Sequence, residues 1–346
     1  MNSILVVRRD NIGDLVCTTP LLSALRRRYP QAWIGGLVNS YNAAVLDRNP
    51  DLDRVFVYAK LKHLDPGQSA LGALARRIAE LWELRRKRLD CVVLATPQFV
   101  PRAWQLARLL APKRIVGCSE QAAREMAGRH EVERVFALAA QLGVDAPIPP
   151  LKVVPDPALT ARALAAFGAA AQGKLRVAVQ ISTRRAAQRW PVERFVELVQ
   201  RLDALGAACM LLWSPGPSDH PRHPGDDEKA AAIAARLEGK APLAAYHAGP
   251  LPELVGALAA CDAVITSDGG AMHLAAALGK PIVCFFGDVA PEQWRPWGVP
   301  HRVLRPESRR AADITVDATV AAFLDLSQES LQDVQVPRGG AAVRPA

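Results

Sequence analysis

The amino-acid sequence predicts an α/β protein with two Rossmann-like domains, whose parallel sheets face one another across a cleft. Short runs such as Ser3–Val7 and Ala263–Thr266 are apolar apart from one terminal Ser or Thr, which is typical of strands covered on both faces. Polar, glycine-containing turns and helical segments follow such runs. The segment Ala146–Pro157 holds five prolines and divides the chain into halves. Because 346 residues are enough for two domains, we expect them over residues 1–150 and 151–326.

The first domain opens with a strand at Ser3–Val7, a charged turn at Arg8–Asp14 and a helix that starts near Leu15 and runs to Arg28. This order is Rossmann-like, although the dinucleotide fingerprint GxGxxG is missing and no P-loop occurs in the chain. Further strands are expected in the apolar runs at residues 33–38, 54–57, 90–94 and 114–117.

A strongly amphipathic helix is expected over Gln68–Arg88. Its apolar face comprises Leu71, Leu74, Ile78, Leu81 and Trp82. Its other side carries six basic residues, namely Arg76, Arg77, Arg85, Arg86, Lys87 and Arg88. The basic side can be a solvated helix face, or it can contact a membrane or an anionic glycolipid.

The second domain restarts with strands at residues 175–181 and 208–213, separated by a helix at residues 192–205. Polar turns follow both strands, at Ser182–Arg185 and Ser214–Asp219. Because ligands of open α/β sheets bind at the carboxyl ends of the strands, these turns are candidate ligand contacts. From Ser327 the composition predicts a disordered tail over residues 327–346.

The stretch Cys261–Gly287 organises the second domain as strand, glycine loop, short helix and second strand. Gly269 and Gly270 leave backbone N–H groups uncovered where the helix begins, which favours an anion. Asp268 and His273 flank this loop and can reach one ligand. The alternative is an ordinary strand-to-helix turn with a capping Asp and a hydrogen-bonded core His.

The net charge of +9 belongs entirely to the first half of the chain. Through Pro155 there are 23 Lys and Arg against 14 Asp and Glu, and the remainder is neutral. This excess indicates an anionic partner, either a phosphorylated glycolipid, a membrane surface or a nucleic acid. Nucleic acid ranks last, because aromatic residues make up only 5% and no nucleic-acid-binding motif occurs.

The six cysteines show no CxxC pairing and lie mostly in apolar runs, which predicts buried thiols rather than disulfides or a zinc site. No leader and no apolar run of membrane-spanning length is recognised, so we expect a cytoplasmic protein, peripheral to a membrane at most. The pair Asp51 and Asp53 is a possible metal motif, but Asn49–Pro50 and the strand that follows favour a structural turn.

Three motifs resemble the ADP-heptose:lipopolysaccharide heptosyltransferases, which are GT-B glycosyltransferases of Gram-negative bacteria. The first is Arg8-x-Asp-x-x-Gly-Asp14 with Thr19-Pro20, and the second is Arg189-Trp-Pro191 with Glu193-Arg-Phe195. The third and most specific is Asp268-Gly-Gly-Ala-Met-His273 through Gly279-Lys-Pro281, with Phe285-Phe-Gly287. The resemblance spans residues 2 to about 325.

This resemblance implies inverting transfer of a heptose from ADP-heptose to an anionic lipopolysaccharide core acceptor, without a metal or other cofactor. It makes residues 1–150 the acceptor-side domain and residues 151–326 the nucleotide-sugar-binding domain. It also implies a location at the cytoplasmic face of the inner membrane, with peripheral membrane contact and no nucleic-acid partner.

The resemblance further assigns roles to individual residues. Asp14 matches the general base, on a turn expected to bind the acceptor through Arg8, Arg9 and Asn11. In the donor site, Ser182 and Thr183 match the hydroxyls that hold the diphosphate, and Glu228 matches the acid that holds the ribose. Asp268 matches the carboxylate that holds the donor sugar. His273 matches the phosphate-side histidine, next to the backbone amides of Gly269 and Gly270.

Two positions depart from the family pattern. Gly269 stands where many members have Thr or Ser, and Gln188 stands where a phosphate-binding lysine is expected. Arg184, Arg185 or Arg189 can supply the missing positive charge. A nucleotide-sugar 2-epimerase of the same architecture and a non-catalytic nucleotide-sugar binder remain the alternative functions.

Overall fold

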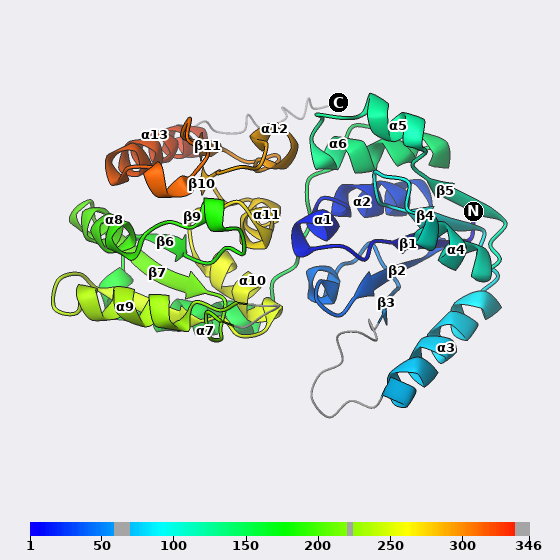
Figure 1. The fold of residues 1–346 in the computed structure, drawn as a ribbon, viewed down its shortest axis with the longest axis horizontal. Coiled ribbons are helices and arrows are strands. Elements are labelled where there is room, and N and C mark those ends of the chain that lie inside the picture. Colours follow the sequence, from blue (N-terminus) through cyan, green and yellow to red (C-terminus); the bar gives the residue numbers. More distant parts are fainter. Residues whose placement is uncertain (59–69, 220–223, 336–346) are drawn as a thin grey trace, which may run out of the picture.

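The computed structural model describes residues 1–58, 70–219 and 224–335, and within them it shows two α/β domains (Figure 1). In Figure 1 the N-terminal domain lies on the right and the C-terminal domain on the left, with the linker between them. The residues from 144 to 156 have no regular secondary structure. Leu151 and Val153 of this segment are buried, so the linker packs against the domains rather than standing free.

The N-terminal sheet has five parallel strands in the order β3-β2-β1-β4-β5. The strands are β1 (Ser3–Val7), β2 (Trp33–Asn39), β3 (Arg54–Tyr58), β4 (Cys91–Leu94) and β5 (Arg114–Gly117). The helices are α1 (Ile12–Val16), α2 (Thr19–Arg28), α3 (Ala70–Arg86), α4 (Pro101–Leu109), α5 (Glu120–Glu125) and α6 (Glu131–Phe136). All five strands lie within two residues of the predicted positions.

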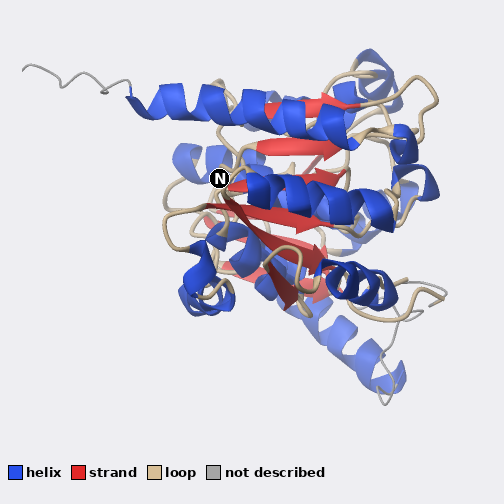
Figure 2. Cartoon of the chain, turned by 90° about the vertical axis from the view of Figure 1, so that its left-hand side faces the viewer, coloured by secondary structure: helices blue, strands red, loops and turns tan. Residues whose placement is uncertain are grey.

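The C-terminal sheet has six parallel strands in the order β11-β10-β9-β6-β7-β8. They are β6 (Leu175–Gln180), β7 (Ala207–Trp213), β8 (Leu243–His247), β9 (Ala263–Ser267), β10 (Ile282–Phe285) and β11 (His301–Leu304). The helices are α7 (Pro157–Ala166), α8 (Val192–Ala204), α9 (Asp227–Leu237), α10 (Leu251–Ala260), α11 (Gly270–Ala277), α12 (Pro291–Trp294) and α13 (Val316–Gln335). Figure 2 shows the sheets with helices on both sides.

Two parallel sheets confirm the predicted fold class. The strands β1, β4, β9 and β10 are buried on both faces, as their continuous apolar sequences predict. One hydrophobic cluster includes residues of both domains, such as Leu15 and Met272, whereas two further clusters cover the other face of each sheet.

One expectation about the elements is wrong, and two strands were not expected. The first helix begins at Ile12 rather than near Leu15, and it ends at Val16 before α2 begins. The edge strands β8 and β11 were missed, because their partly exposed residues lack the continuous apolar pattern of the central strands.

The predicted tail is corrected for residues 327–335, because α13 continues to Gln335. Arg302 of β11 pairs with both Asp325 and Glu329, at 2.6 and 2.7 Å, which fixes successive turns of this helix. Ser327 also donates to the carbonyl of Phe323 at 2.8 Å. Residues 336–346 lie outside the described part of the chain.

The helix expected over Gln68–Arg88 is α3, but its apolar side is only partly covered. Leu81 packs on the core and Leu84 is fully buried, whereas Ile78 and Trp82 are 58% and 60% exposed. The side chains of Leu71 and Leu74 lie outside the described residues. Figure 1 shows α3 at the outer edge of the N-terminal domain. No helix among the described residues is long and apolar enough to cross a membrane.

Candidate active site

A cavity of about 530 Å³ lies between the two domains, at the carboxyl ends of β1, β6 and β9. The N-terminal domain contributes the turn and first helical residues after β1, and the C-terminal domain contributes the turns after β6 and β9. Eleven predicted site residues line it, namely Asn11, Asp14, Ser182, Thr183, Arg184, Arg185, Gln188, Asp268, Gly269, Gly270 and His273. Parallel strands bring these residues together, because their carboxyl ends meet at one edge of each sheet.

On the N-terminal side of the cavity, Asp14 is held in place by both of its carboxylate oxygens. Oδ1 accepts from Nη2 of Arg8 at 2.7 Å, and Oδ2 accepts from the backbone N–H and the side chain of Asn11, both at 3.0 Å. The second contact makes Asp14 part of the N-terminal cap of α1. The side chain keeps 13% of its surface exposed and lines the cavity, so the capping contact leaves it accessible from the cavity.

Arg8 is buried, with 2% of its surface exposed, and its guanidinium faces groups of the protein itself. Besides Asp14 it pairs with Glu131 at 2.8 Å and Asp10 at 2.9 Å, and it donates to the carbonyl of Ala95. The prediction that Arg8 binds an acceptor is therefore corrected. It positions Asp14, because burial and three carboxylates leave its charge no route to a ligand.

Opposite Asp14, a chain of polar contacts runs from Thr183 through Gln188 to Asp268. Thr183 Oγ1 donates to Gln188 Oε1 at 3.1 Å, and Gln188 Nε2 donates to Asp268 Oδ2 at 2.8 Å. Gln188 is buried at 1% exposure, so it orients Asp268 instead of standing free. Burial raises the pKa of Asp268 to about 6, although the Gln188 hydrogen bond and Arg185 oppose the shift.

His273 lies on α11 at the contact between the two domains. Its ring is buried at 2% exposure, with Nδ1 3.7 Å from Cys17 Sγ and the ring edge against Trp294. Burial, together with the nearby His130, lowers the pKa of His273 to about 4, so the ring is neutral at pH 7. The ring lines the cavity as a neutral hydrogen-bonding group.

The close approach of α1 to α11 depends on Gly13. A Cβ atom on Gly13 would lie 2.5 Å from Cδ2 of His273, which is closer than packed atoms come. On the other helix, a Cβ on Gly270 would lie 3.1 Å from Ile12. A Cβ on Gly269 would meet nothing within 4 Å, which leaves space at the N-terminus of α11.

The turn after β6 supplies positive charge to the cavity. Arg184 reaches across the domains and donates to Asn11 Oδ1 at 3.2 Å, whereas Arg185 forms a long, exposed pair with Asp288 at 3.6 Å. Ser182 Oγ accepts from the backbone N–H of Ser214, which joins this turn to the turn after β7. Arg189 Nε lies 3.4 Å from the carbonyl of Thr183, outside the cavity lining.

Two predicted ligand contacts lie elsewhere. Glu228 is exposed at the start of α9, bonds to Ser218 at 2.8 Å and does not line the cavity. Its neighbour Asp227 accepts from Trp213 and Gly216, so this acidic pair holds the loop after β7. Arg9 lies at a separate cavity of the N-terminal domain.

Sequence reasoning missed three residues of this region. Glu131 is a buried carboxylate bound to Arg8 and Arg134, and burial raises its pKa. Tyr41, after β2, and Trp294, at the end of α12, line the cavity. No local sequence signal identifies them, because they reach the site only through tertiary packing.

Asp51 and Asp53 are both used inside the N-terminal domain. Asp51 accepts from Ser23 and Lys152, and Asp53 accepts from Arg26 and the backbone N–H of Ile34. These contacts support the structural interpretation of this pair. Within the described residues no group of three or more His, Cys, Asp or Glu could hold a metal ion. All six cysteines are buried and free, as predicted.

The profile of glycosyltransferase family 9 (heptosyltransferase) matches residues 91–319. Lipopolysaccharide heptosyltransferase 3 of Escherichia coli is 25% identical over 303 residues, 82% of this chain and 83% of that protein. Lipopolysaccharide heptosyltransferase 2 of Salmonella typhimurium is 27% identical over 329 residues, 87% of each. The solved structure of E. coli ADP-heptose lps heptosyltransferase II has the same GT-B fold, with a TM-score of 0.74, 22% identity and coverage of 96% and 100%. The chain thus belongs to glycosyltransferase family 9, the heptosyltransferases, and is a glycosyltransferase.

Proposed function

We propose that this enzyme transfers a heptose from ADP-heptose to an anionic lipopolysaccharide core acceptor, with inversion at the anomeric carbon and without a metal. The names of its relatives support the substrates. The observation that carries the mechanism is the placement of Asp14 across one cavity from Asp268 and the N-terminus of α11. One side offers a proton acceptor, and the other offers groups suited to a sugar diphosphate.

In this mechanism Asp14 is the general base. The acceptor hydroxyl transfers its proton to the Asp14 carboxylate while its oxygen attacks the anomeric carbon of the heptose. The bond from that carbon to the diphosphate breaks, and ADP leaves with the electron pair. Arg8 and Asn11 hold the two oxygens of Asp14, so the carboxylate is oriented before the acceptor arrives.

The C-terminal domain stabilises the leaving ADP. Arg184 and Arg185 supply positive charge, and the backbone N–H groups of Gly269 and Gly270 lie at the positive end of the α11 dipole. Ser182, Thr183 and neutral His273 add hydrogen bonds to phosphate oxygens. Asp268 accepts hydrogen bonds from donor-sugar hydroxyls. Glu228 is not part of this proposal, because it lies outside the cavity.

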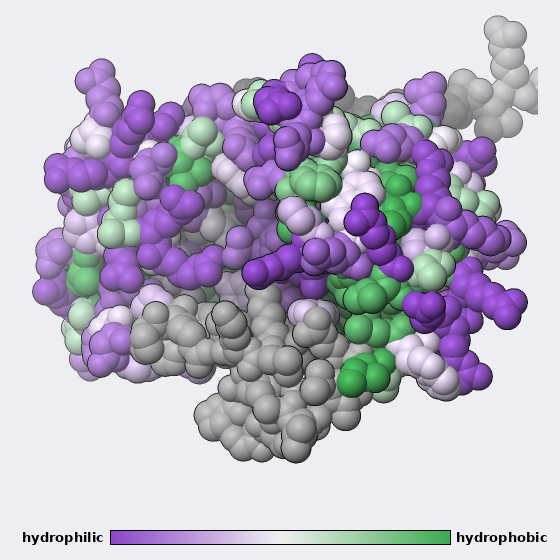
Figure 3. All heavy atoms as spheres, turned by 45° about the vertical axis from the view of Figure 1, so that its right-hand side comes forward, coloured by the Kyte–Doolittle hydropathy of each residue, from purple (hydrophilic) through white to green (hydrophobic). Residues whose placement is uncertain are grey.

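We propose that the enzyme works at the cytoplasmic face of the inner membrane, with α3 contacting the lipid surface. Exposed Ile78 and Trp82 stand beside the exposed basic run Arg85–Arg88 at the end of this helix. Arg86 lies over the Trp82 ring at 4.4 Å. Figure 3 shows hydrophobic and hydrophilic residues side by side on the N-terminal side of the molecule. Such a mixed surface favours an anionic membrane interface.

One experiment tests the transferase proposal. The protein is incubated with ADP-heptose alone and then with a lipid A–Kdo acceptor, while ADP and sugar products are quantified. We expect ADP release only when the acceptor is present. A 2-epimerase would convert the donor without acceptor, and a binding protein would bind ADP-heptose without any product, so either result would refute the proposal.

A further inference from the structure

Glu131 is a buried carboxylate to which the mechanism above gives no role. It is the first residue of α6, its side chain is 2% exposed, and it does not line the cavity between the domains. Its Oε1 accepts a hydrogen bond from Nη2 of Arg8 at 2.8 Å. The same nitrogen atom donates to Oδ1 of Asp14 at 2.7 Å. One buried guanidinium nitrogen is therefore shared by the proposed base and a second carboxylate.

Contacts with both domains fix the backbone position of Glu131. His130, the N-terminal cap of α6, accepts through Nδ1 from the backbone N–H of Val132 at 3.2 Å. Its Nε2 therefore carries the ring proton and donates to the carbonyl oxygen of Arg295 in the C-terminal domain, at 2.8 Å. The ring also packs on Trp297, with ring centroids 4.6 Å apart. The start of α6 is thus held between the two domains.

Two arginines keep Glu131 in its charged form near neutral pH. Its Oε1 faces Arg8 and its Oε2 faces Arg134 at 3.1 Å, at the positive end of the α6 dipole. Gln293 of α12 adds a long contact to Oε2 at 3.5 Å. Burial raises the pKa of Glu131, and the arginines oppose that shift. A second negative charge therefore shares the cationic partner of Asp14.

This second charge opposes the effect of Arg8 on Asp14. Beside an arginine alone, a carboxylate is stabilised as an anion and becomes a weak proton acceptor. A neighbouring negative charge repels the carboxylate and favours its protonated form. The interaction is strong here, because Arg8 and Glu131 are each only 2% exposed and little water screens them.

We infer that Glu131 is a positioning residue for the general base. It shares Arg8 with Asp14, and its negative charge makes Asp14 a stronger acceptor for the proton of the sugar hydroxyl, while Arg8 keeps the carboxylate oriented. The inference rests on the proposed function, in which Asp14 takes that proton. The alternative is that Glu131 only compensates the buried charge of Arg8.

The other ionisable groups that face this pair keep one charge state at pH 7. Arg8 and Arg134 are cationic. Cys17 is a neutral thiol, because burial raises its pKa well above the usual value. Burial lowers the pKa of His130 and of His273, so both rings are neutral. A changed pH dependence after a substitution in the pair therefore reports on carboxylates.

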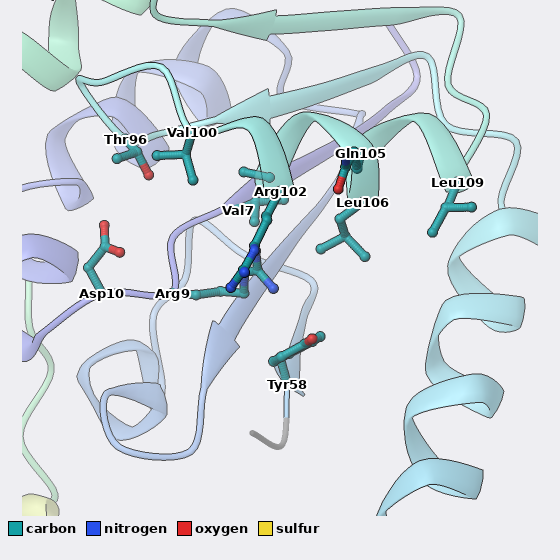
Figure 4. Close-up of a pocket in the computed structure, with 11 residues that line it drawn as sticks. Val7, Arg9, Asp10, Tyr58, Thr96, Val100, Arg102, Gln105, Leu106 and Leu109 are labelled. Carbon is teal, nitrogen blue, oxygen red and sulfur yellow. The ribbon is translucent and has the colours of Figure 1, made fainter. Parts of the chain in front are cut away.

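Asp10 provides the matched control, because it also faces Arg8. It lies 2.9 Å from Nε of Arg8 but makes no hydrogen bond with that atom, and 39% of its side chain is exposed. It lines a separate cavity of about 480 Å³ in the N-terminal domain, and Figure 4 shows it among the residues of that lining. Because water screens this carboxylate, Asp10→Asn should affect Asp14 much less than Glu131→Gln does.

Carbon-13 NMR of the ligand-free protein measures the coupling directly. The Asp14 carboxyl, assigned with the Asp14→Asn protein, should titrate about one pH unit lower in Glu131→Gln than in wild type. In Asp10→Asn its midpoint should move less than half as far. The coupling is reciprocal, so the Glu131 carboxyl should titrate about one pH unit lower in Asp14→Asn, a measurement that does not require Glu131→Gln to fold. Midpoints that stay in place, or move equally in Asp10→Asn, would overturn the inference.

Turnover shows whether this coupling serves the reaction. At saturating donor, Glu131→Gln should lower kcat about 3- to 10-fold and shift the acidic decline of kcat to lower pH, because a weaker base loses its proton more readily. Glu131→Asp keeps the charge and should retain more of the wild-type kcat. The affinity for ADP should not change in either variant. A loss of stability with an unchanged pH profile and unchanged NMR midpoints would leave Glu131 as a structural partner of Arg8 and overturn the inference.

The two measurements separate this inference from the proposed mechanism. Movement of the NMR midpoints without movement of the kcat profile would show that the coupling exists but that Asp14 is not the base, so the proposed mechanism would fail. Unmoved NMR midpoints in a protein that transfers heptose would overturn the inference and leave the proposed function standing.

Discussion

Arg8 shows how a single buried charge organises the proposed active site. Its guanidinium faces Asp10, Asp14 and Glu131, and burial of such a group is tolerated only because these carboxylates compensate its charge. The coulombic attraction of the three acids raises the pKa of Arg8, despite the opposing effect of burial. Asp14 therefore has a fixed cationic partner on one side and the open cavity on the other.

The first prediction concerns Asp14 as the base. Asp14→Asn should lower kcat about 10²- to 10⁴-fold, because the amide cannot take the acceptor proton. The affinity for ADP-heptose should be unchanged. The free energy of unfolding should fall by about 1–3 kcal/mol, because Arg8 loses a charged partner. Steady-state kinetics at saturating acceptor and thermal melting provide the measurements.

Asp10→Asn is the matched control, since Asp10 also pairs with Arg8 but lines the other cavity. Its kcat should stay within a few-fold of wild type. A well-folded Asp14→Asn protein with near-normal turnover would remove the general base from the mechanism.

The second prediction uses the raised pKa of Asp268. Because this pKa is about 6 in the ligand-free protein, the carboxylate is protonated as the pH falls from 7.5 to 5. A protonated Asp268 accepts sugar hydroxyls less well, so calorimetry should show ADP-heptose binding weakened about tenfold at pH 5. The folded protein holds this proton more tightly than the unfolded chain, so this group's contribution to stability decreases as pH rises from about 4 to 6.

ADP without the sugar is the control ligand for Asp268, because the proposed contact is with sugar hydroxyls. Its affinity should change much less over the same pH range. The Asp268→Asn protein should bind ADP-heptose with a flat pH profile between pH 5 and 7.5. A wild-type profile that is equally flat would show that Asp268 does not contact the sugar.

At the scale of secondary-structure elements, the contact of α1 with α11 sets the distance between base and donor site. The third prediction is that Gly13→Ala pushes these helices apart, because its Cβ would lie 2.5 Å from His273. Overpacking of this kind costs about 1–3 kcal/mol of folding free energy. The variant should melt at a lower temperature and have a lower kcat/KM for both substrates.

The double variant Gly13→Ala/His273→Ala shows whether the clash is the cause. Removal of the imidazole should make room for the new methyl group, so Gly13→Ala should cost little stability in the His273→Ala background. Donor affinity in that background should still be reduced by the lost phosphate contact. Additive losses of stability would contradict the steric explanation.

The helix α3 carries the fourth prediction. Changing Arg85, Arg86, Lys87 and Arg88 to Gln should weaken binding to vesicles that contain anionic lipid and should raise the KM for the lipid acceptor. The effect should shrink at high salt, where the Debye length falls well below about 8 Å. Donor KM should not change. Vesicle sedimentation and kinetics at low and high salt provide the measurements.

The double variant Arg124→Gln/Arg129→Gln is a charge control, because both arginines are exposed on or after α5, elsewhere on the same domain. Its vesicle binding should stay close to wild type. If the α3 variant shows an unchanged acceptor KM at low salt, this helix has a merely solvated basic face.

At the scale of the whole molecule, the sequence predicted the layers better than the contacts between them. Central strands such as β1 and β9 are recognisable because burial on both faces requires continuous apolar runs. The edge strands β8 and β11 are half-exposed and carry no such pattern. Helical periodicity predicted an apolar face for α3, but periodicity alone cannot show whether another element covers that face. Ile78 and Trp82 of this face are exposed.

The residues of the candidate site were likewise predicted only in part. Asp14, Asp268 and His273 all line the cavity between the domains. Asp268 and His273 were singled out because they flank the turn after a strand, and Asp14 was singled out by the family resemblance. Arg8 was misassigned and Glu131 was missed, since their burial arises from contacts between segments 123 residues apart in the chain. Local patterns cannot reveal which of two neighbouring arginines faces inward.

The last prediction concerns the charge balance of the complete active site. The leaving diphosphate must be stabilised, and in the proposed mechanism Arg184, Arg185 and the N-terminus of α11 do this in place of a divalent cation. Turnover should therefore be unchanged after dialysis against EDTA, and added Mg²⁺ or Mn²⁺ should not increase it. Arg184→Gln/Arg185→Gln should instead lower kcat and weaken ADP binding, because the cavity then loses two of the positive charges that face the diphosphate. If EDTA abolished turnover and Mg²⁺ restored it, the leaving group would depend on a metal, and the roles of the two arginines would have to be reassigned.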